Sequence, residues 1–476
     1  MTHIPGTRIF RAHLFHIAGS PAQQDVTQAL VSIPDGALVV SGDHGEIAWV
    51  GPWADLPAEH AGAPVTRADY LIPGFVDSHV HYPQSYATAA HGGGQLLEWL
   101  DHCIFPTETQ YADPEFAGRA ARYFTRRRIA AGTTAAMVFG SAFPVAQDAL
   151  YRETLASGLR VVSGRGIQTV GPDAASALIT DEKTAIDLVA KEINHWHAVD
   201  TGDPRTARVQ VAIVPRFSLS VTAQTLGALG ELYDEARMRG VYFHSHLNEN
   251  NRKGDGEIAA VLATYGVETY LDTYDGRFLS GSREGGRTLL GRRSSLAHAV
   301  HSQPRELARM AETGTSIAHC PTSQLFLGSG TMPWQATMDA GVNVALGTDI
   351  GAGDEWLISR VAGDCYKVHI SEEGDAGTAL HPAELLFAAT LAGARALDME
   401  HAFGNLDVGK EADFLLIEKS RWEPLDGMLT MGIRSDDEAE ATLEELFTLL
   451  MGLRQPAIAG VYVQGQEVVT PGLDPD

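Results

Sequence analysis

The chain has 476 residues, with 35 Lys and Arg against 60 Asp and Glu, so its formal net charge is −25. This acidic balance argues against a nucleic-acid backbone or an anionic membrane as a partner, because both attract basic surfaces. Hydrophobic residues make up 44% and charged residues 20%, as is typical of a folded globular protein. No apolar run approaches the ~20 residues of a membrane-spanning helix, and we expect no signal peptide.

The three cysteines, Cys103, Cys320 and Cys365, are far apart in the sequence. They cannot form a disulfide framework or a CxxC zinc cage, so we expect a reducing, cytoplasmic compartment. Any metal site is therefore expected to use His and carboxylate ligands, for which 19 histidines are available. The HxE…PCxxC signature of one class of zinc enzymes is absent.

The two ends of the chain are built from short strands and turns. A hairpin is predicted at 37–40 and 46–50, a single strand at 413–417, and a second hairpin at 460–463 and 467–470. Neither end has enough apolar segments for a core of its own. We therefore expect residues 1–70 and 404–476 to pair into one small composite β-sandwich domain.

Eight short apolar segments rich in β-branched residues lie between the two ends: 71–77, 133–139, 159–163, 209–215, 241–245, 294–299, 315–320 and 342–348. Helix-like stretches separate most of them, for example 114–131, 181–197, 223–238 and 306–312. This alternation predicts an α/β fold, a (β/α)8 TIM-type barrel over residues 71–403. The Gly- and Arg-rich stretch 281–291 is expected to be an exposed loop.

Metal-competent side chains follow several of these predicted strands at the carboxyl end, where such barrels carry their active sites. His79 and His81 share one face of an extended segment, because strand side chains repeat every second residue. An HxH pair alone is weak evidence. His246 and Asp349, at the ends of the fifth and eighth strands, strengthen it, so the sequence predicts a site for one cation such as zinc.

Other polar residues near these strand ends are candidates for acting on water or substrate. Glu249 lies three residues after His246 and is expected to reach a water in the site, whereas a solvated loop carboxylate is the plainer interpretation. His298 ends the sixth strand. The histidines His244, His301, His319 and His369 are expected to be structural, His319 being the most doubtful because it also follows a strand.

Seven motifs in this order resemble the guanine deaminases of the amidohydrolase superfamily. They are PGFVDSHVHYPQ (73–84), LLEWLDHCIFPTE (96–108), PRFS (215–218), HSHLNEN (244–250), AHCPTSQLFLGSG (318–330), LGTDIGAG (346–353) and GKEADF (409–414). The first, sixth and seventh are shared across the superfamily. LLEWL…FPTE, PRFS and CPTSQLFLGSG are specific to the guanine deaminases. The stretch NRKGDG (251–256) departs from the pattern and resembles a short insertion.

The resemblance implies a role for each matching residue, listed here by type: metal ligands His79, His81, His246 and Asp349; catalytic residues Glu249, His298 and Asp349; substrate-binding residues Gln84, Arg216, Phe217 and His298. It also implies hydrolytic deamination of guanine at C2, giving xanthine and ammonia in purine catabolism. The implied cofactor is one divalent ion, Zn2+ or, alternatively, Fe2+. The implied assembly is a homodimer acting on a small purine.

Three other interpretations are weighed against this one. Another mononuclear barrel deaminase or a triazine hydrolase would share the ligands and differ in the pocket. A two-metal hydrolase would use a bridging lysine after the fourth strand, where this chain has Arg216. A non-catalytic scaffold would be expected to have lost some of the ligands, all of which are present here.

Overall fold

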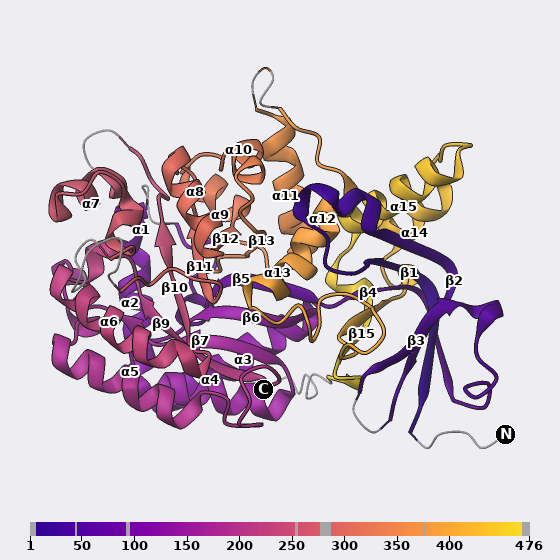
Figure 1. Cartoon of the computed structure of the whole chain (residues 1–476), viewed down its shortest axis with the longest axis horizontal. Helices are drawn as coiled ribbons and strands as arrows, with labels where there is room; N and C mark the ends of the chain where they lie inside the picture. Colours follow the sequence, from indigo (N-terminus) through magenta and orange to yellow (C-terminus); the bar gives the residue numbers. More distant parts are fainter. Residues whose placement is uncertain are drawn as a thin grey trace.

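The computed structural model describes residues 6–42, 45–91, 96–252, 256–276, 287–372, 374 and 377–468. The molecule has two parts along its long axis, a barrel on the left of Figure 1 and a smaller sheet on the right. In these ranges no helix combines the length and apolar character needed to cross a membrane.

Eight parallel strands form the barrel in sequence order, as predicted. They are β5 (Phe75–His81), β6 (Thr133–Phe139), β7 (Arg160–Gly164), β9 (Val209–Pro215), β10 (Tyr242–Leu247), β11 (Ser294–His298), β12 (Ser316–His319) and β13 (Val344–Leu346). The short strand β8 (Gly166–Ile167) pairs with β9 beside them. Nearly every residue of these strands is buried, because the barrel interior and the surrounding helices cover both faces.

The prediction for the first strand, 71–77, was wrong in its limits. The chain passes from one part of the molecule to the other at Gly74: β4 (Val65–Pro73) belongs to the small sheet, and β5 of the barrel begins at Phe75. A Cβ atom at Gly74 would lie 2.4 Å from the side chain of Thr134, so glycine permits the close approach at this crossing. The two strands form one uninterrupted apolar run in the sequence, which concealed the boundary.

The barrel closes where β5 meets the segment after β13. The amide of Asp349 donates to the carbonyl of His79 at 2.8 Å, and the amide of His81 donates to the carbonyl of Ile350 at 2.9 Å. Next to these two bonds, the amide and hydroxyl of Thr348 donate to the carboxylate of Asp77 at 3.0 and 2.6 Å. This seam therefore fixes the relative positions of three of the four predicted metal ligands.

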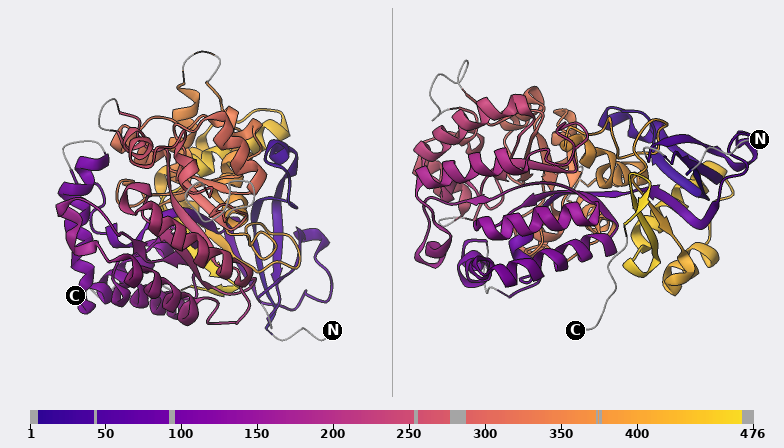
Figure 2. Two further views of the ribbon diagram at one scale, coloured as in Figure 1. Left: turned by 60° about the vertical axis from the view of Figure 1, so that its left-hand side comes forward. Right: turned by 90° about the horizontal axis from the view of Figure 1, so that it is seen from below.

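Helices cover the outside of the barrel and alternate with its strands (Figure 2). The main ones are α3 (Pro114–Ala130), α4 (Pro144–Ser157), α5 (Glu182–Trp196), α6 (Ala223–Ala236), α7 (Glu257–Tyr265), α8 (Pro304–Thr313), α11 (Ile358–Ile370), α12 (Pro382–Ala389) and α13 (Leu391–Ala396). The four predicted helices are confirmed to within a few residues. Helix α3 begins as expected from its sequence, because Asp113 accepts from the amide of Phe116 at 2.7 Å and proline occupies the first turn. Most of the predicted loop at 281–291 lies outside the described residues.

The two ends of the chain pair as predicted, and their strands form one seven-stranded sheet. Its order is β16 (Gln466–Glu467), β15 (Ile458–Val463), β14 (Phe414–Ile417), β4, β1 (Arg8–Ile17), β2 (Leu30–Val40) and β3 (Ile47–Pro52). The antiparallel pair β4–β14 joins the N-terminal and C-terminal segments. The rings of Phe10, Phe414 and Tyr462, with centroids 4.6 to 5.0 Å apart, pack the two ends together.

Two helices in the C-terminal segment were not predicted. Helices α14 (Glu423–Met431) and α15 (Glu438–Gly452) interrupt the strands, and α15 packs against α11 and α12 of the barrel. Asp437 accepts from the amide of Glu440 at 2.9 Å and thereby caps α15. The domain limits 1–70, 71–403 and 404–476 remain a prediction.

Candidate metal centre and active site

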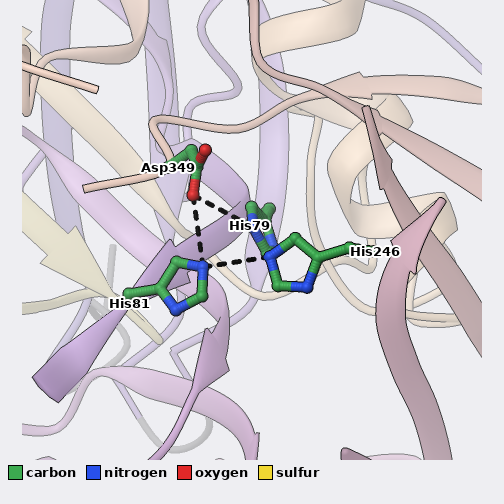
Figure 3. Close-up of side chains that lie close together, drawn as sticks. All are labelled: His79, His81, His246 and Asp349. Atoms are coloured by element: carbon green, nitrogen blue, oxygen red, sulfur yellow. Dashed lines mark hydrogen bonds and ion pairs between the residues drawn. The ribbon is translucent and has the colours of Figure 1, made fainter. Parts of the chain in front are cut away.

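Four buried side chains converge at the carboxyl end of the barrel strands (Figure 3). His79 and His81 come from β5, His246 from β10, and Asp349 from the segment after β13. Oδ1 of Asp349 lies 3.1 Å from Nε2 of His79 and 3.2 Å from Nε2 of His81, and Nε2 of His81 lies 3.2 Å from Nε2 of His246. The structure thus brings together all four residues expected to bind a metal.

Hydrogen bonds from the surrounding protein direct Nε2 of His79 into this cluster. Nδ1 of His244 lies 2.8 Å from the carbonyl oxygen of Ser295, which only accepts, so this nitrogen carries the proton. Nε2 of His244 is then an acceptor, and Nδ1–H of His79 donates to it at 2.8 Å. The lone pair of His79 is therefore left on Nε2, which faces Asp349.

The ring of His246 is oriented in the same way by a backbone carbonyl. Its Nδ1 donates to the carbonyl oxygen of Arg216 at 2.5 Å, so its Nε2 also presents a lone pair to the cluster. Outer hydrogen bonds of this kind are typical of metal-ligating histidines. Three imidazole nitrogens and one carboxylate form a donor set that fits a single zinc or iron ion.

Burial determines the charge state of these groups. It lowers the pKa of His81 to about 4 and that of His246 well below the usual value, so both rings are neutral at pH 7, as ligation requires. Burial alone would raise the pKa of Asp349, but the neighbouring histidines outweigh it and bring that pKa well below its usual value. The cluster thus offers the neutral rings of His81 and His246 and the carboxylate of Asp349, beside the ring of His79.

Glu249 and His298 lie next to this cluster, as predicted. Nε2 of His298 is 3.4 Å from Oε2 of Glu249 and 3.8 Å from Oδ2 of Asp349. Oε1 of Glu249 and both ring nitrogens of His298 are buried without a hydrogen-bond partner among the residues described. Unsatisfied buried polar atoms are costly, and a substrate or water in the site would satisfy them.

The surroundings of Glu249 suit proton transfer, and those of His298 suit hydrogen-bond donation. Burial and the nearby carboxylates of Asp349 and Glu257 raise the pKa of Glu249 well above its usual value. A carboxyl group with a raised pKa can take up and return a proton at neutral pH. Burial lowers the pKa of His298 to about 3, so its ring is neutral.

His298 and Asp349 have left-handed backbone φ values of 74° and 48°, a strained conformation often found at functional sites.

Two of the predicted substrate-binding residues, Gln84 and Arg216, form one wall of the site with a partner that we did not predict. Nη1 of Arg216 donates to both oxygens of Glu108, at 2.9 and 2.7 Å, and Nε2 of Gln84 donates to Oε1 of Glu108 at 3.1 Å. Oε1 of Gln84 accepts from the amide of Gly351 at 3.2 Å. Glu108 therefore holds Gln84 and Arg216 in fixed positions. Glu108 is the last residue of the FPTE motif, and the sequence alone predicts no role for its carboxylate.

One pocket connects these groups. Its lining combines the predicted polar residues with apolar side chains that come mainly from the 96–100 segment: His81, Gln84, Leu96, Trp99, Leu100, Arg216, Phe217, His246, Glu249, Glu257, His298, Leu327, Asp349 and Ala352. The site is thus a small apolar pocket with a few convergent polar groups.

Sequence reasoning missed the residues that orient the site rather than line it. His244 was expected to be structural, and the structure places it in a hydrogen-bond chain that ends on His79. Asp77 accepts from Thr348 across the seam and was not considered. A polar residue inside a buried barrel strand, two positions before a predicted ligand, is the signal that could have identified both.

Comparison with known proteins agrees with this geometry. The sequence profile of the amidohydrolase family matches residues 70–468. The probable guanine deaminase of Deinococcus radiodurans is 37% identical over 454 residues, which cover 94% of this chain and 95% of that protein. The solved structure of Escherichia coli guanine deaminase has a TM-score of 0.82 and 30% identity, covering 97% of this chain and 99% of that one.

A third similar protein was solved with a ligand. Guanine deaminase from C. acetobutylicum, with bound guanine in the active site, has a TM-score of 0.81 and 25% identity, covering 97% of this chain and 100% of that one. The family profile spans most of the chain, and the four converging ligands and barrel architecture lie within the matched region. This chain therefore belongs to the amidohydrolase family.

Proposed function

We propose that this chain is a metal-dependent guanine deaminase that hydrolyses guanine at C2 and releases xanthine and ammonia. The observation that carries the proposal is one cavity that joins Glu249 and His298 to the four-residue metal cluster and to the wall formed by Gln84, Glu108 and Arg216. The similar proteins named guanine deaminase support the substrate, as does the C. acetobutylicum structure with guanine bound in its active site.

In this proposal His79, His81, His246 and Asp349 hold one divalent ion, zinc in the first instance and iron as the alternative. When bound, such an ion lowers the pKa of a coordinated water to around neutral and supplies a hydroxide nucleophile. The neutral rings of His81 and His246 and the ionised Asp349 need no further deprotonation to bind the ion at pH 7. Metal analysis of the purified protein distinguishes zinc from iron.

Glu249 is proposed to move the proton that the reaction requires. It takes the proton of the attacking water and delivers it to the ring nitrogen next to C2, which makes C2 more electrophilic. His298 stabilises the negative charge that develops on the attacking oxygen, donating from a neutral ring because burial lowers its pKa to about 3. Asp349 relays a second proton to the leaving amine. Water and guanine are thereby converted into xanthine and ammonia.

Recognition of the purine is assigned to Arg216, Gln84 and Phe217. One guanidinium nitrogen of Arg216 is used by Glu108, and the remaining N–H groups suit the C6 carbonyl of guanine. The amide of Gln84 retains one further N–H and one further lone pair, so it both donates and accepts, as a lactam edge requires. The ring of Phe217 forms part of the apolar lining.

A turnover screen tests the assignment. Guanine, adenine, cytosine, 8-oxoguanine and melamine are offered to the purified enzyme, and released ammonia is measured. We expect guanine to have the highest kcat/KM of the five. A higher value for melamine or cytosine would overturn the assignment and favour the triazine or pyrimidine deaminases.

A cytoplasmic location and a homodimeric assembly complete the proposal. The location is supported by the three cysteines, which are all free thiols in the structure, as expected in a reducing compartment. The dimer rests on the resemblance to the guanine deaminases. Light scattering of the purified protein tests the assembly, and a monomeric mass at micromolar concentration would contradict it.

A further inference from the structure

A second cluster of metal-competent side chains is not used by the proposed reaction. It consists of His319 at the end of β12 and of Cys365 and His369 on α11, and it shares no residue with the catalytic cluster. All three side chains are completely buried. One ligand atom from each lies within 4.8 Å of the others. Buried His and Cys side chains that converge in this way need a physical explanation.

The positions of the three residues suit a shared ion. Cys365 and His369 are four residues apart on α11 and therefore project from the same face of the helix. Nε2 of His369 lies 3.1 Å from Nε2 of His319. The two Nε2 atoms of His81 and His246 in the catalytic cluster are separated by 3.2 Å. With Zn–N bonds of ~2.05 Å, a separation of 3.1 Å corresponds to an N–Zn–N angle of roughly 100°.

A carboxylate orients His369 as a ligand. Nδ1 of His369 lies 2.9 Å from Oε1 of Glu372, so this nitrogen carries the proton and Nε2 presents a lone pair to His319. The same carboxylate–histidine arrangement orients metal-bound imidazoles in many proteins. Nδ1 of His319 is buried, and within the described part of the chain it has no hydrogen-bond partner. Ligation through Nε2 of His319 would place the proton of that ring on Nδ1, whereas without an ion Nε2–H of His319 can donate to the Nε2 lone pair of His369.

The surroundings also favour a cation. The ring of Trp334 packs against the pair, with its centroid 5.0 Å from that of His369 and 6.1 Å from that of His319, and contributes to keeping the cluster dry. His369 lies in the last turn of α11, where the helix dipole is negative. A thiol and two imidazoles are ligands preferred by zinc among the common divalent ions. Binding converts the Cys365 thiol to a thiolate and releases its proton.

We propose that His319, Cys365 and His369 bind a structural zinc ion, distinct from the catalytic ion, that ties barrel strand β12 to helix α11. Helix α11 in turn packs on α15 of the C-terminal segment, where the rings of Tyr366 and Phe447 lie 4.9 Å apart. The ion would thus connect the barrel to the C-terminal part of the chain. This inference stands whether or not guanine is the substrate.

Metal counting provides the first test. Mass spectrometry of the purified wild-type protein should find two metal ions per chain, one for each cluster. His246→Ala should lose one ion and Cys365→Ser the other. The control Cys103→Ser, which changes a partly buried thiol outside both clusters, should retain both. A wild-type protein with one ion, removed entirely by His246→Ala, would show that the His319–His369 contact is a simple hydrogen bond. One copper ion at this cluster would overturn the choice of zinc.

Cobalt provides a second test that does not depend on whether the variants fold. Protein produced with cobalt in place of zinc should show a thiolate-to-cobalt charge-transfer band in the near ultraviolet. The catalytic cluster has no sulfur ligand, so this band reports only the second cluster. We expect the band in the wild type and in Cys103→Ser, and its loss in Cys365→Ser. A wild-type protein that binds cobalt without this band would overturn the proposal.

Discussion

The two ring nitrogens of His79 contact different partners, and this division explains how the catalytic cluster is arranged. Nδ1 is held by His244 at 2.8 Å, whereas Nε2 faces Asp349 at 3.1 Å. His244 is itself fixed by the carbonyl of Ser295. The buried residue His244 therefore determines which lone pair of His79 faces the proposed metal site.

This hydrogen-bond chain predicts the effect of changing His244. His244→Leu removes the acceptor for the His79 proton, so we expect metal affinity to fall by roughly 10- to 100-fold, the range typical of lost outer-sphere contacts. His244→Gln retains an acceptor oxygen and should recover part of the affinity. Titration against a competing chelator measures both. Equal affinity in the Leu and Gln variants would show that His244 only fills space.

A change at Glu249 separates proton transfer from metal binding. Glu249→Gln is nearly isosteric but cannot carry a proton, so turnover should fall by about 10²-fold or more while the metal content stays unchanged. Steady-state kinetics and metal analysis on the same preparation test this. Near wild-type turnover would mean that Glu249 is a loop carboxylate with no chemical role.

Arg216 is expected to determine the choice between guanine and adenine. Its guanidinium can donate to the C6 carbonyl of guanine but finds no acceptor in the C6 amine of adenine. Sites of this kind discriminate against the wrong analogue by as much as ~10⁴–10⁵ in kcat/KM. Arg216→Ala should lower kcat/KM for guanine and reduce the preference over adenine. If Arg216→Ala keeps the full preference for guanine over adenine, another residue recognises the substituent at C6.

The closure of the barrel between β5 and the segment after β13 also positions the proposed metal ligands. The hydroxyl of Thr348 donates to Asp77 at 2.6 Å, next to the backbone bonds that join His79 to Asp349. Burial raises the pKa of Asp77 to about 6, so its carboxylate depends on these donors. Stability and ligand geometry are therefore coupled at this seam.

Thr348→Val tests this coupling. The substitution keeps the shape of the side chain and leaves Oδ2 of Asp77 without its donor, so we expect a loss of about 1–3 kcal/mol in the free energy of unfolding. Because Asp349 follows directly, kcat/KM should fall as well. Thr348→Ser keeps the hydroxyl and should resemble the wild type in thermal melting and in activity. Unchanged melting of the Val variant would contradict the interpretation.

His16 is buried where the two ends of the chain meet, and this burial makes the stability of the whole molecule sensitive to acid. His16 lies on β1, and its Nδ1 is 4.0 Å from Oδ1 of Asp407 in the C-terminal segment. Burial lowers its pKa from 6.5 to about 4, against an opposing effect of Asp407. The folded protein therefore binds this proton less readily than the unfolded chain.

As the pH falls below 6.5 the unfolded chain gains a proton at His16 before the folded protein does, so stability is lost progressively down to pH 4. At pH 5 the loss from this residue is about 2 kcal/mol. His16→Gln removes the titrating ring and should reduce the fall in melting temperature between pH 7 and pH 5. Parallel melting curves at both pH values, compared with the wild type, test this. An equal fall in both proteins would exclude His16.

Much of the barrel and of the catalytic cluster could be predicted from the sequence. Strand side chains alternate with a period of two, so His79 and His81 had to share a face, and parallel strands of a barrel end on one side, so His246 and Asp349 had to lie near them. These are local rules that depend on spacing along the chain.

The remaining features depend on contacts between segments that are distant in the sequence. Glu108 meets Arg216 across 108 residues, and His319 meets His369 across 50, so no spacing rule indicates either pair. The boundary between β4 and β5 lies within one apolar run, because both strands are buried, although in different sheets. The tertiary structure decides which buried polar side chains meet, because the free energy of burying a polar group depends on the partner that the fold brings to it.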